Sequence, residues 1–199
     1  IETRNWNALW ESNFEPVDVQ GRCVIRAPFH PAPGGDTLDV VIMPKMSFGT
    51  GHHATTWLMC SEILGLDLEG KEGLDMGSGT GVLAVVAAMR GARHLDAVDI
   101  DEWAFENSTE NIASNGVADR ITPIPGDVSV ISGRRYEFIL ANINRNILLA
   151  DMRAYDEALQ PGGVLVVSGI IEQDIAAIRR QAAGLGLVFR PSPVKAGWA

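Results

Sequence analysis

The sequence is poor in cysteine, in basic residues and in long apolar runs. Its two cysteines, Cys23 and Cys60, form no C-x-x-C pair, which excludes a small disulfide-stapled scaffold and favours reduced thiols in a cytoplasmic protein. No apolar run approaches the ~18 residues that a membrane span requires, and no basic-then-apolar leader opens the chain. With 16 basic against 25 acidic residues, the net charge of −9 argues against DNA binding and favours a basic partner or a cationic ligand.

What the 199 residues do contain is an alternation of apolar and amphipathic segments after about residue 60. Residues 1–60 are irregular and rich in proline and glycine, so we expect an entry arm, a linker and a capping loop there. Residues 61–199 are expected to form one α/β domain with a mostly parallel sheet. The expected strands are 73–76, 94–99, 120–124, 137–141, 164–168 and 187–190, and the expected helices are 56–64, 82–90, 101–115, 146–159 and 172–185. Ligands of such sheets bind at the carboxyl ends of the strands.

A glycine-rich loop, Gly77 to Gly81, follows the first strand and precedes a helix. Glycine lets a ligand approach the backbone closely, and the amides of the helix N-terminus face that ligand. The spacing is G-x-G-x-G, and Val82 stands where the dinucleotide fingerprint has its third glycine. Asp75 lies two residues before the loop, where a carboxylate would repel a pyrophosphate but suit the ammonium group of an amino acid. The combination favours S-adenosylmethionine over NAD.

Three aspartates follow the next two strands. Asp99 ends the second strand, where a carboxylate can accept hydrogen bonds from both hydroxyls of a ribose. Asp101 fits either a ligand contact or the N-cap of the following helix. Asp127 follows the third strand, where it would flank an adenine, although a loop cap explains it nearly as well.

Polar residues also gather after the fourth strand and before the first helix. Asn142 ends an apolar strand beside the glycine loop, where its side-chain oxygen can hold a nucleophilic amine; the alternative is an ordinary turn asparagine. Segment 47–56 combines glycines, hydroxyls and the pair His52–His53. Adjacent histidines without a spaced carboxylate or cysteine argue against a metal site. We therefore expect no metal and a loop that caps the ligand, with Thr55 or Thr56 as a helix cap or a ligand hydroxyl.

The chain resembles the bacterial ribosomal protein L11 methyltransferases. The similarity lies in residues 5–16, 48–56, 75–81, 98–101, 141–143, 161–163 and 168–170, and so runs across nearly the whole chain. The glycine loop is generic to methyltransferases that use S-adenosylmethionine. The stretch Phe-Gly-Thr-Gly-His at 48–52, together with Ala-Asn-Ile at 141–143, is far more specific.

The resemblance implies a Rossmann-like, doubly wound sheet of seven strands, of which the last lies beyond the position of Ala199. It implies a cytoplasmic enzyme that methylates lysine side chains and the N-terminal amine of ribosomal protein L11. The family's amino-terminal domain, which captures the substrate, has no counterpart in a chain that begins at Ile1, so we expect a catalytic fragment. Cofactor contacts are implied at Thr56, Gly77, Asp99 and Asn142. We extend these contacts to neighbouring residues of the same loops, and Asn142 is the expected catalytic residue; the added contacts are Phe48, Thr50, Asp75, Ser78, Gly79, Ile100 and Asp127.

Three alternatives remain open on the sequence. A methyltransferase acting on another protein, an RNA or a small molecule would share the cofactor half, and only the segments around Phe48 and Asn142 discriminate. An NAD-dependent oxidoreductase is more distant, because of the glycine spacing and Asp75. A non-catalytic module that has kept the fold is the third, and the intact glycine loop and Asp99 count against it.

Overall fold

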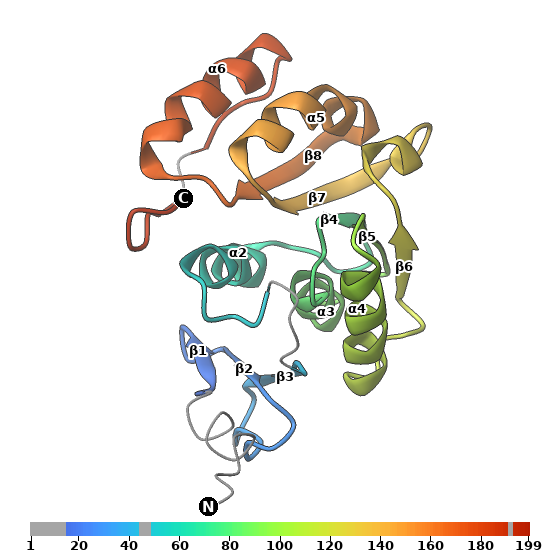
Figure 1. Ribbon diagram of the computed structural model, residues 1–199, viewed down its shortest axis with the longest axis vertical. Coiled ribbons are helices and arrows are strands. Elements are labelled where there is room, and N and C mark those ends of the chain that lie inside the picture. Colours follow the sequence, from blue (N-terminus) through green and yellow to red (C-terminus); the bar gives the residue numbers. More distant parts are fainter. Residues whose placement is uncertain (1–14, 44–48, 191–192) are drawn as a thin grey trace, which may run out of the picture.

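The computed structural model describes residues 15–43, 49–190 and 193–199 (Figure 1). The expected site residue Phe48 lies outside the described residues. The described part forms one sheet of five strands and one of three strands. None of its helices combines the length and the apolar character that crossing a membrane requires.

The larger sheet forms from the apolar segments that follow residue 70. Its strands are β4 (Glu72–Met76), β5 (His94–Asp99), β6 (Ile121–Pro125), β7 (Tyr136–Asn142) and β8 (Leu159–Ser168). All five run parallel, in the order β6-β5-β4-β7-β8. From β4 the chain first adds β5 and β6 on one side of the sheet and then adds β7 and β8 on the other side. This topology confirms the expected α/β, doubly wound, Rossmann-like class.

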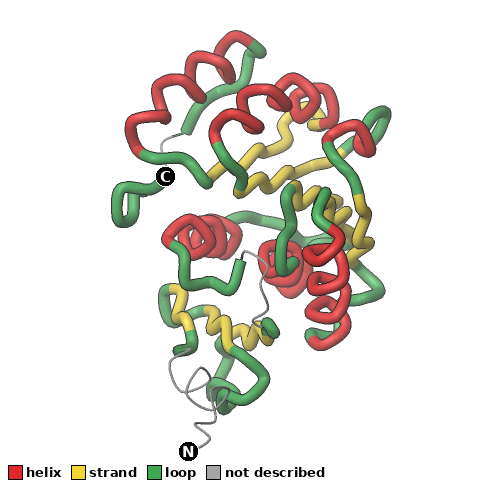
Figure 2. The backbone as a smooth tube through the Cα atoms, in the orientation of Figure 1, coloured by secondary structure: helices red, strands yellow, loops and turns green. Residues whose placement is uncertain are grey.

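Alternate residues of the central strands enter two separate hydrophobic cores. In β7, Phe138 and Leu140 belong to one core and Ile139 and Ala141 to the other. The first core includes residues of α2 (Ala54–Gly65), α3 (Val82–Met89) and α4 (Glu102–Ser114), and the second includes residues of α5 (Arg145–Ala158), α6 (Ile175–Gly184) and the 3-10 helix η1 (Val128–Ile131). Figure 2 shows these helices on the two sides of the strands. A continuous apolar strand is what a sheet covered on both faces requires.

The smaller sheet precedes the glycine loop in the chain. It consists of β1 (Val17–Val19), β2 (Cys23–Arg26) and β3 (Leu38–Val41). β2 pairs antiparallel with β1 and parallel with β3. Val19, Ile25 and Val40 belong to the same core as α2 and α3. The small sheet therefore packs on the face of the domain that carries the helix after the glycine loop.

The described sheet has five strands instead of the seven that the resemblance implied, and the expected strand 187–190 does not form. Leu187 packs on the second core, but Val188 is 87% exposed. Within the described ranges this segment pairs with no strand, although the outer edge of β8 carries none, and it remains irregular. The expected helix over 172–185 begins later, as α6, after the 3-10 helix η2 (Glu172–Asp174).

Strand β8 is longer than its apolar core suggested. It begins at Leu159 and continues through Pro161, with an irregular register opposite Tyr136 and Phe138 of β7. Proline cannot donate a hydrogen bond to the ladder, and a bulge accommodates it. The Pro-Gly-Gly segment at 161–163, which lies between the expected helix 146–159 and the expected strand 164–168, is therefore a distortion inside a strand.

Candidate functional site

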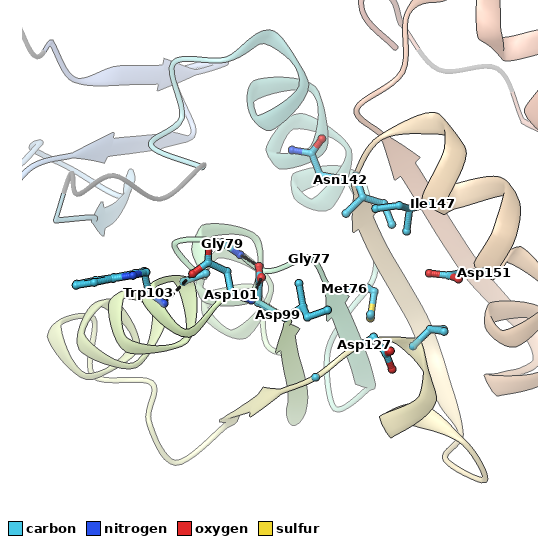
Figure 3. Close-up of a pocket in the computed structure, with 15 residues that line it drawn as sticks. Met76, Gly77, Gly79, Asp99, Asp101, Trp103, Asp127, Asn142, Ile147 and Asp151 are labelled. Carbon is cyan, nitrogen blue, oxygen red and sulfur yellow. Dashed lines mark hydrogen bonds between the residues drawn. The ribbon is translucent and has the colours of Figure 1, made fainter.

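A cavity of about 940 Å³ opens at the carboxyl ends of β4, β5, β6 and β7 (Figure 3). The strand order reverses at this edge, since β5 lies on one side of β4 and β7 on the other. Loops that leave the sheet in opposite directions at such a point create a crevice for a ligand. The sequence predicted this location, because its candidate residues follow these strands.

Three glycines shape the loop after β4. The φ angle is 71° at Gly77, 54° at Gly79 and 77° at Gly81, in the left-handed region that glycine adopts readily. Gly77 and Gly79 line the cavity. A Cβ atom on Gly77 would overlap Cγ2 of Ile143, which follows β7. The glycine loop therefore presents bare backbone to the cavity at a place where a side chain does not fit.

Asp99 is held at the end of β5 by two backbone amides. The N–H of Gly79 donates to Oδ2 over 2.8 Å, and the N–H of Asp101 donates to Oδ1 over 3.0 Å. The side chain is half-buried and lines the cavity. Each carboxylate oxygen retains a lone pair for a further donor. The geometry suits a pair of ribose hydroxyls, and it also ties β5 to the glycine loop.

Asp75 does not reach the cavity. Its side chain is fully buried, Oδ2 accepts a hydrogen bond from the N–H of Ala84 over 3.0 Å, and Oδ1 has no partner. Side chains alternate along a strand, so the neighbour Met76 faces the cavity while Asp75 faces α3. The expected contact with a ligand ammonium group is therefore corrected: Asp75 lies behind the glycine loop, against the first turn of α3.

The environment of Asp75 leads to a prediction about stability. Burial raises the pKa of Asp75 to about 7, against an ordinary value of 3.8. Between these values the folded state holds a proton that the unfolded state releases, so the free energy of unfolding falls as the pH rises from 4 to 7. The loss from this group is on the order of 4 kcal/mol and is complete above pH 7.

We expect Asp75→Asn to remove this titration. In urea unfolding at pH 4.5, 6 and 8, the stability of the variant relative to the wild type should increase with pH. A constant difference across this range would show that Asp75 is ionised in both states.

Asp101 and Asp127 each cap a helix and also line the cavity. Oδ1 of Asp101 accepts a hydrogen bond from the N–H of Trp103 over 2.8 Å, and Oδ1 of Asp127 accepts one from the N–H of Ser129 over 2.9 Å. The bonds from Ser129 lower the pKa of Asp127. Capping is therefore confirmed for both residues, and a ligand contact remains a prediction. Ile100, which is 78% exposed, lines the same side of the cavity.

Besides Oδ1 of Asp75 and the hydroxyl of Ser78, two side-chain oxygens of the expected site are buried without a hydrogen-bond partner among the described residues. They are Oδ1 of Asn142, at the end of β7, and Oγ1 of Thr56, in the first turn of α2. Asn142 lines the cavity, whereas the fully buried Thr56 does not. A buried polar atom without a hydrogen-bond partner is unfavourable, and a ligand or a water molecule commonly supplies the missing hydrogen bond. Asn142 therefore combines a place in the lining of the cavity with a buried acceptor oxygen that no described residue satisfies.

Ser78 and Thr50 are not brought to the cavity. Ser78 is 5% exposed, and its hydroxyl has no partner; Oγ1 of Thr50 lies 3.2 Å from Nδ1 of His52. The N-cap of α2 is His53, whose side chain accepts a hydrogen bond from the N–H of Thr55. This corrects the expectation that a threonine caps that helix. No group of three or more potential metal ligands occurs within residues 15–43, 49–190 and 193–199.

Helix α5 forms one wall of the cavity, through residues that were not predicted from the sequence. Ile147 and Asp151 lie one turn apart and both line the cavity. Figure 3 shows them across Met76 from Asp99. Burial raises the pKa of Asp151. The sequence signal for this wall was the four-residue spacing of Ile147 and Asp151 in the helix that follows Asn144, because residues i and i+4 share a helix face.

The lining of the cavity carries charge of one sign. Asp99, Asp101, Asp127 and Asp151 all line it, and no Lys, Arg or His of the described residues does so. Their carboxylates come from the end of β5, the turn that follows it, the loop after β6, and α5. An anionic lining raises the local concentration of a cationic ligand and repels a phosphate.

The parallel sheet, the bare glycine loop after β4 and the carboxylate that ends β5 fit a methyltransferase of the class that uses S-adenosylmethionine. The family model "Ribosomal protein L11 methyltransferase (PrmA)" matches residues 1–199. The chain therefore belongs to the ribosomal protein L11 methyltransferase family.

Individual relatives agree with this assignment. A ribosomal protein L11 methyltransferase of Bacteroides fragilis is 48% identical over 200 residues, which are 100% of this chain and 71% of that protein. One of Porphyromonas gingivalis is 45% identical over 197 residues, covering 98% of this chain and 68% of that protein. The crystal structure of a ribosomal protein L11 methylase from Lactobacillus delbrueckii subsp. bulgaricus shares the fold, with a TM-score of 0.85 and 24% identity, over 93% of this chain and 95% of that chain.

Proposed function

We propose that this protein transfers methyl groups from S-adenosylmethionine to lysine side chains and the N-terminal amine of ribosomal protein L11. The observation that carries the proposal is the cavity at which the glycine loop, Asp99 and Asn142 meet. The names of the relatives support the same substrate. We place the reaction in the cytoplasm, and the free thiols of Cys23 and Cys60 support this location. We propose no DNA partner for the protein. Residues 61–199 would form the main part of the catalytic domain, and the small sheet β1–β3 of the preceding segment packs into the same core.

The residues of the cavity fit S-adenosylmethionine. Asp99 would hold the ribose, the bare loop at Gly77 and Gly79 the amino acid part, and Ile100 and Asp127 the adenine. S-adenosylmethionine supplies an electrophilic methyl group on a positively charged sulfur, and the anionic lining suits that charge. The same lining would repel the pyrophosphate of NAD, which argues against an oxidoreductase.

The contribution of the protein to the reaction is binding and orientation. The amine must be neutral when it attacks, because its lone pair forms the new bond. A lysine amine has an ordinary pKa of about 10.4; the positively charged sulfur beside it would lower that pKa, against the carboxylates of the lining, which would raise it. Oδ1 of Asn142, which has no partner in the structure, can accept an N–H from the amine and so direct its lone pair. Orientation of this kind accelerates a reaction strongly.

Methylation of purified ribosomal protein L11 tests the proposal. Incubation with S-adenosylmethionine carrying a labelled methyl group should label L11, and mass spectrometry should locate the methyl groups on lysines and the N-terminal amine. Ribosomal RNA and free amino acids serve as competing acceptors in the same assay. Labelling of RNA or amino acids instead of L11 would support the alternative methyltransferase functions.

A further inference from the structure

Helix α4 and its C-cap residue carry three asparagines on one face. Asn107, Asn111 and Asn115 are spaced by four residues, and Asn107 and Asn111 are each 1% exposed. Residues at this spacing share a helix face. Asparagine is a poor helix former, and a buried amide is unfavourable unless it is hydrogen-bonded. The series therefore calls for specific partners on the neighbouring elements.

Asn115 and Asn111 bind the free edge of β3 and the residues just after it. The N–H of Val41 donates to Oδ1 of Asn115 over 2.8 Å, and Nδ2 of Asn115 donates to the carbonyl of Val41 over 2.7 Å. Two residues further on, the N–H of Met43 donates to Oδ1 of Asn111 over 2.8 Å. The other edge of β3 pairs with β2. Helix α4 thus takes the place that a further strand would have beside β3.

Asn111 differs from Asn115 because it also binds the glycine loop. Its Nδ2 donates to the carbonyl of Thr80 over 2.9 Å. The hydroxyl of Thr80 in turn donates to the carbonyl of Gly49 over 2.7 Å. The end of the small sheet, the glycine loop and the start of the expected capping loop are therefore connected through one amide and one hydroxyl.

The position of Thr80 makes this connection consequential. Thr80 stands between Gly79 and Gly81, whose φ angles are 54° and 77°. Glycine backbones lose more conformational freedom on ordering than other residues do. A loop that is already held in its binding conformation binds a ligand more tightly, because less freedom is lost on binding. Asn111 suits this task, since its oxygen accepts a hydrogen bond from the N–H of Met43 while its nitrogen donates one to the carbonyl of Thr80.

We propose that Asn111 is a positioning residue that holds the glycine loop in its ligand-binding conformation and couples it to the small sheet. This inference rests on the proposed binding of S-adenosylmethionine at that loop. Asn111 does not itself line the cavity, so it acts through the backbone of Thr80. Affinity for the cofactor should therefore depend on Asn111 and be insensitive to Asn115.

The experiment compares Asn111→Leu with the matched control Asn115→Leu. Both changes replace the amide with a bulkier apolar group and remove hydrogen bonds to Val41 or Met43, but only the first releases the glycine loop. Isothermal calorimetry with S-adenosylhomocysteine should show a Kd raised about fivefold to tenfold for Asn111→Leu, the loss of one buried hydrogen bond. Asn115→Leu should bind within about twofold of the wild type, although both variants lower the Tm.

The outcomes separate the two proposals. Equal affinities of the two variants, or wild-type affinity of Asn111→Leu, would overturn the role of Asn111 while leaving the cofactor assignment intact. Absence of binding by the wild-type protein would overturn the cofactor assignment and this inference with it. If a leucine variant does not fold, the pair Asn111→Ala and Asn115→Ala provides the same comparison.

Discussion

Asp99→Ala is expected to abolish binding of S-adenosylhomocysteine in calorimetry. The carboxylate lines the cavity, and it is positioned by the amides of Gly79 and Asp101 with lone pairs left for a ligand. Each hydrogen bond to a charged group contributes roughly 1.5–3 kcal/mol. Loss of two such bonds to the ribose hydroxyls corresponds to about 100-fold weaker binding or more. The variant also releases the glycine loop from β5.

Asp119→Ala is the control for this experiment. Asp119 is exposed and lies in the turn before β6, at the opposite end of the strands from the cavity. The control removes the same charge from the protein and should bind as the wild type does. Asp99→Asn is a graded variant: it keeps the size of the side chain but replaces one acceptor oxygen with a donor. Unchanged affinity of Asp99→Ala would remove the ribose assignment.

Asn142→Ala is expected to lower turnover by about 100-fold while changing cofactor affinity by less than about tenfold. The reason is that Asn142 lines the cavity and that its Oδ1 has no partner among the described residues, which leaves an acceptor that can orient the amine of the substrate. Loss of orientation by about one ångström can reduce a rate about 100-fold. The measurement combines steady-state rates of L11 methylation with calorimetric titration of S-adenosylhomocysteine.

Asn144→Ala separates orientation from helix capping. Asn144 is the N-cap of α5, where its Oδ1 accepts hydrogen bonds from the N–H groups of Asn146 and Ile147. Its replacement should cost about 1 kcal/mol of stability and leave turnover unchanged at temperatures where the protein is folded. If Asn142→Ala weakens cofactor binding as strongly as it lowers turnover, Asn142 is mainly a cofactor ligand.

The elements around the cavity follow largely from local sequence signals. The strand expected over 94–99 is β5, and the helix expected over 101–115 is α4 with Asp101 as its N-cap. These signals are strong because apolar runs, glycines and capping residues act on neighbours within a few residues. The positive φ angles at Gly77 and Gly81 also follow from the G-x-G-x-G spacing. Segment 187–190 shows the limit of local signals, since an apolar pattern forms a strand only where the tertiary structure pairs it with another strand.

By itself, the amino-acid sequence determined the α/β class, the glycine loop and the strand ends at which ligand-binding residues stand. Only the tertiary structure decided which side chains meet there. It turned Asp75 away toward α3, brought Asp151 of α5 to the cavity wall and joined Asn111 to Thr80. The physical reason is that these contacts join residues on different elements. Their geometry depends on how helices pack on both faces of the sheet, which no local pattern specifies.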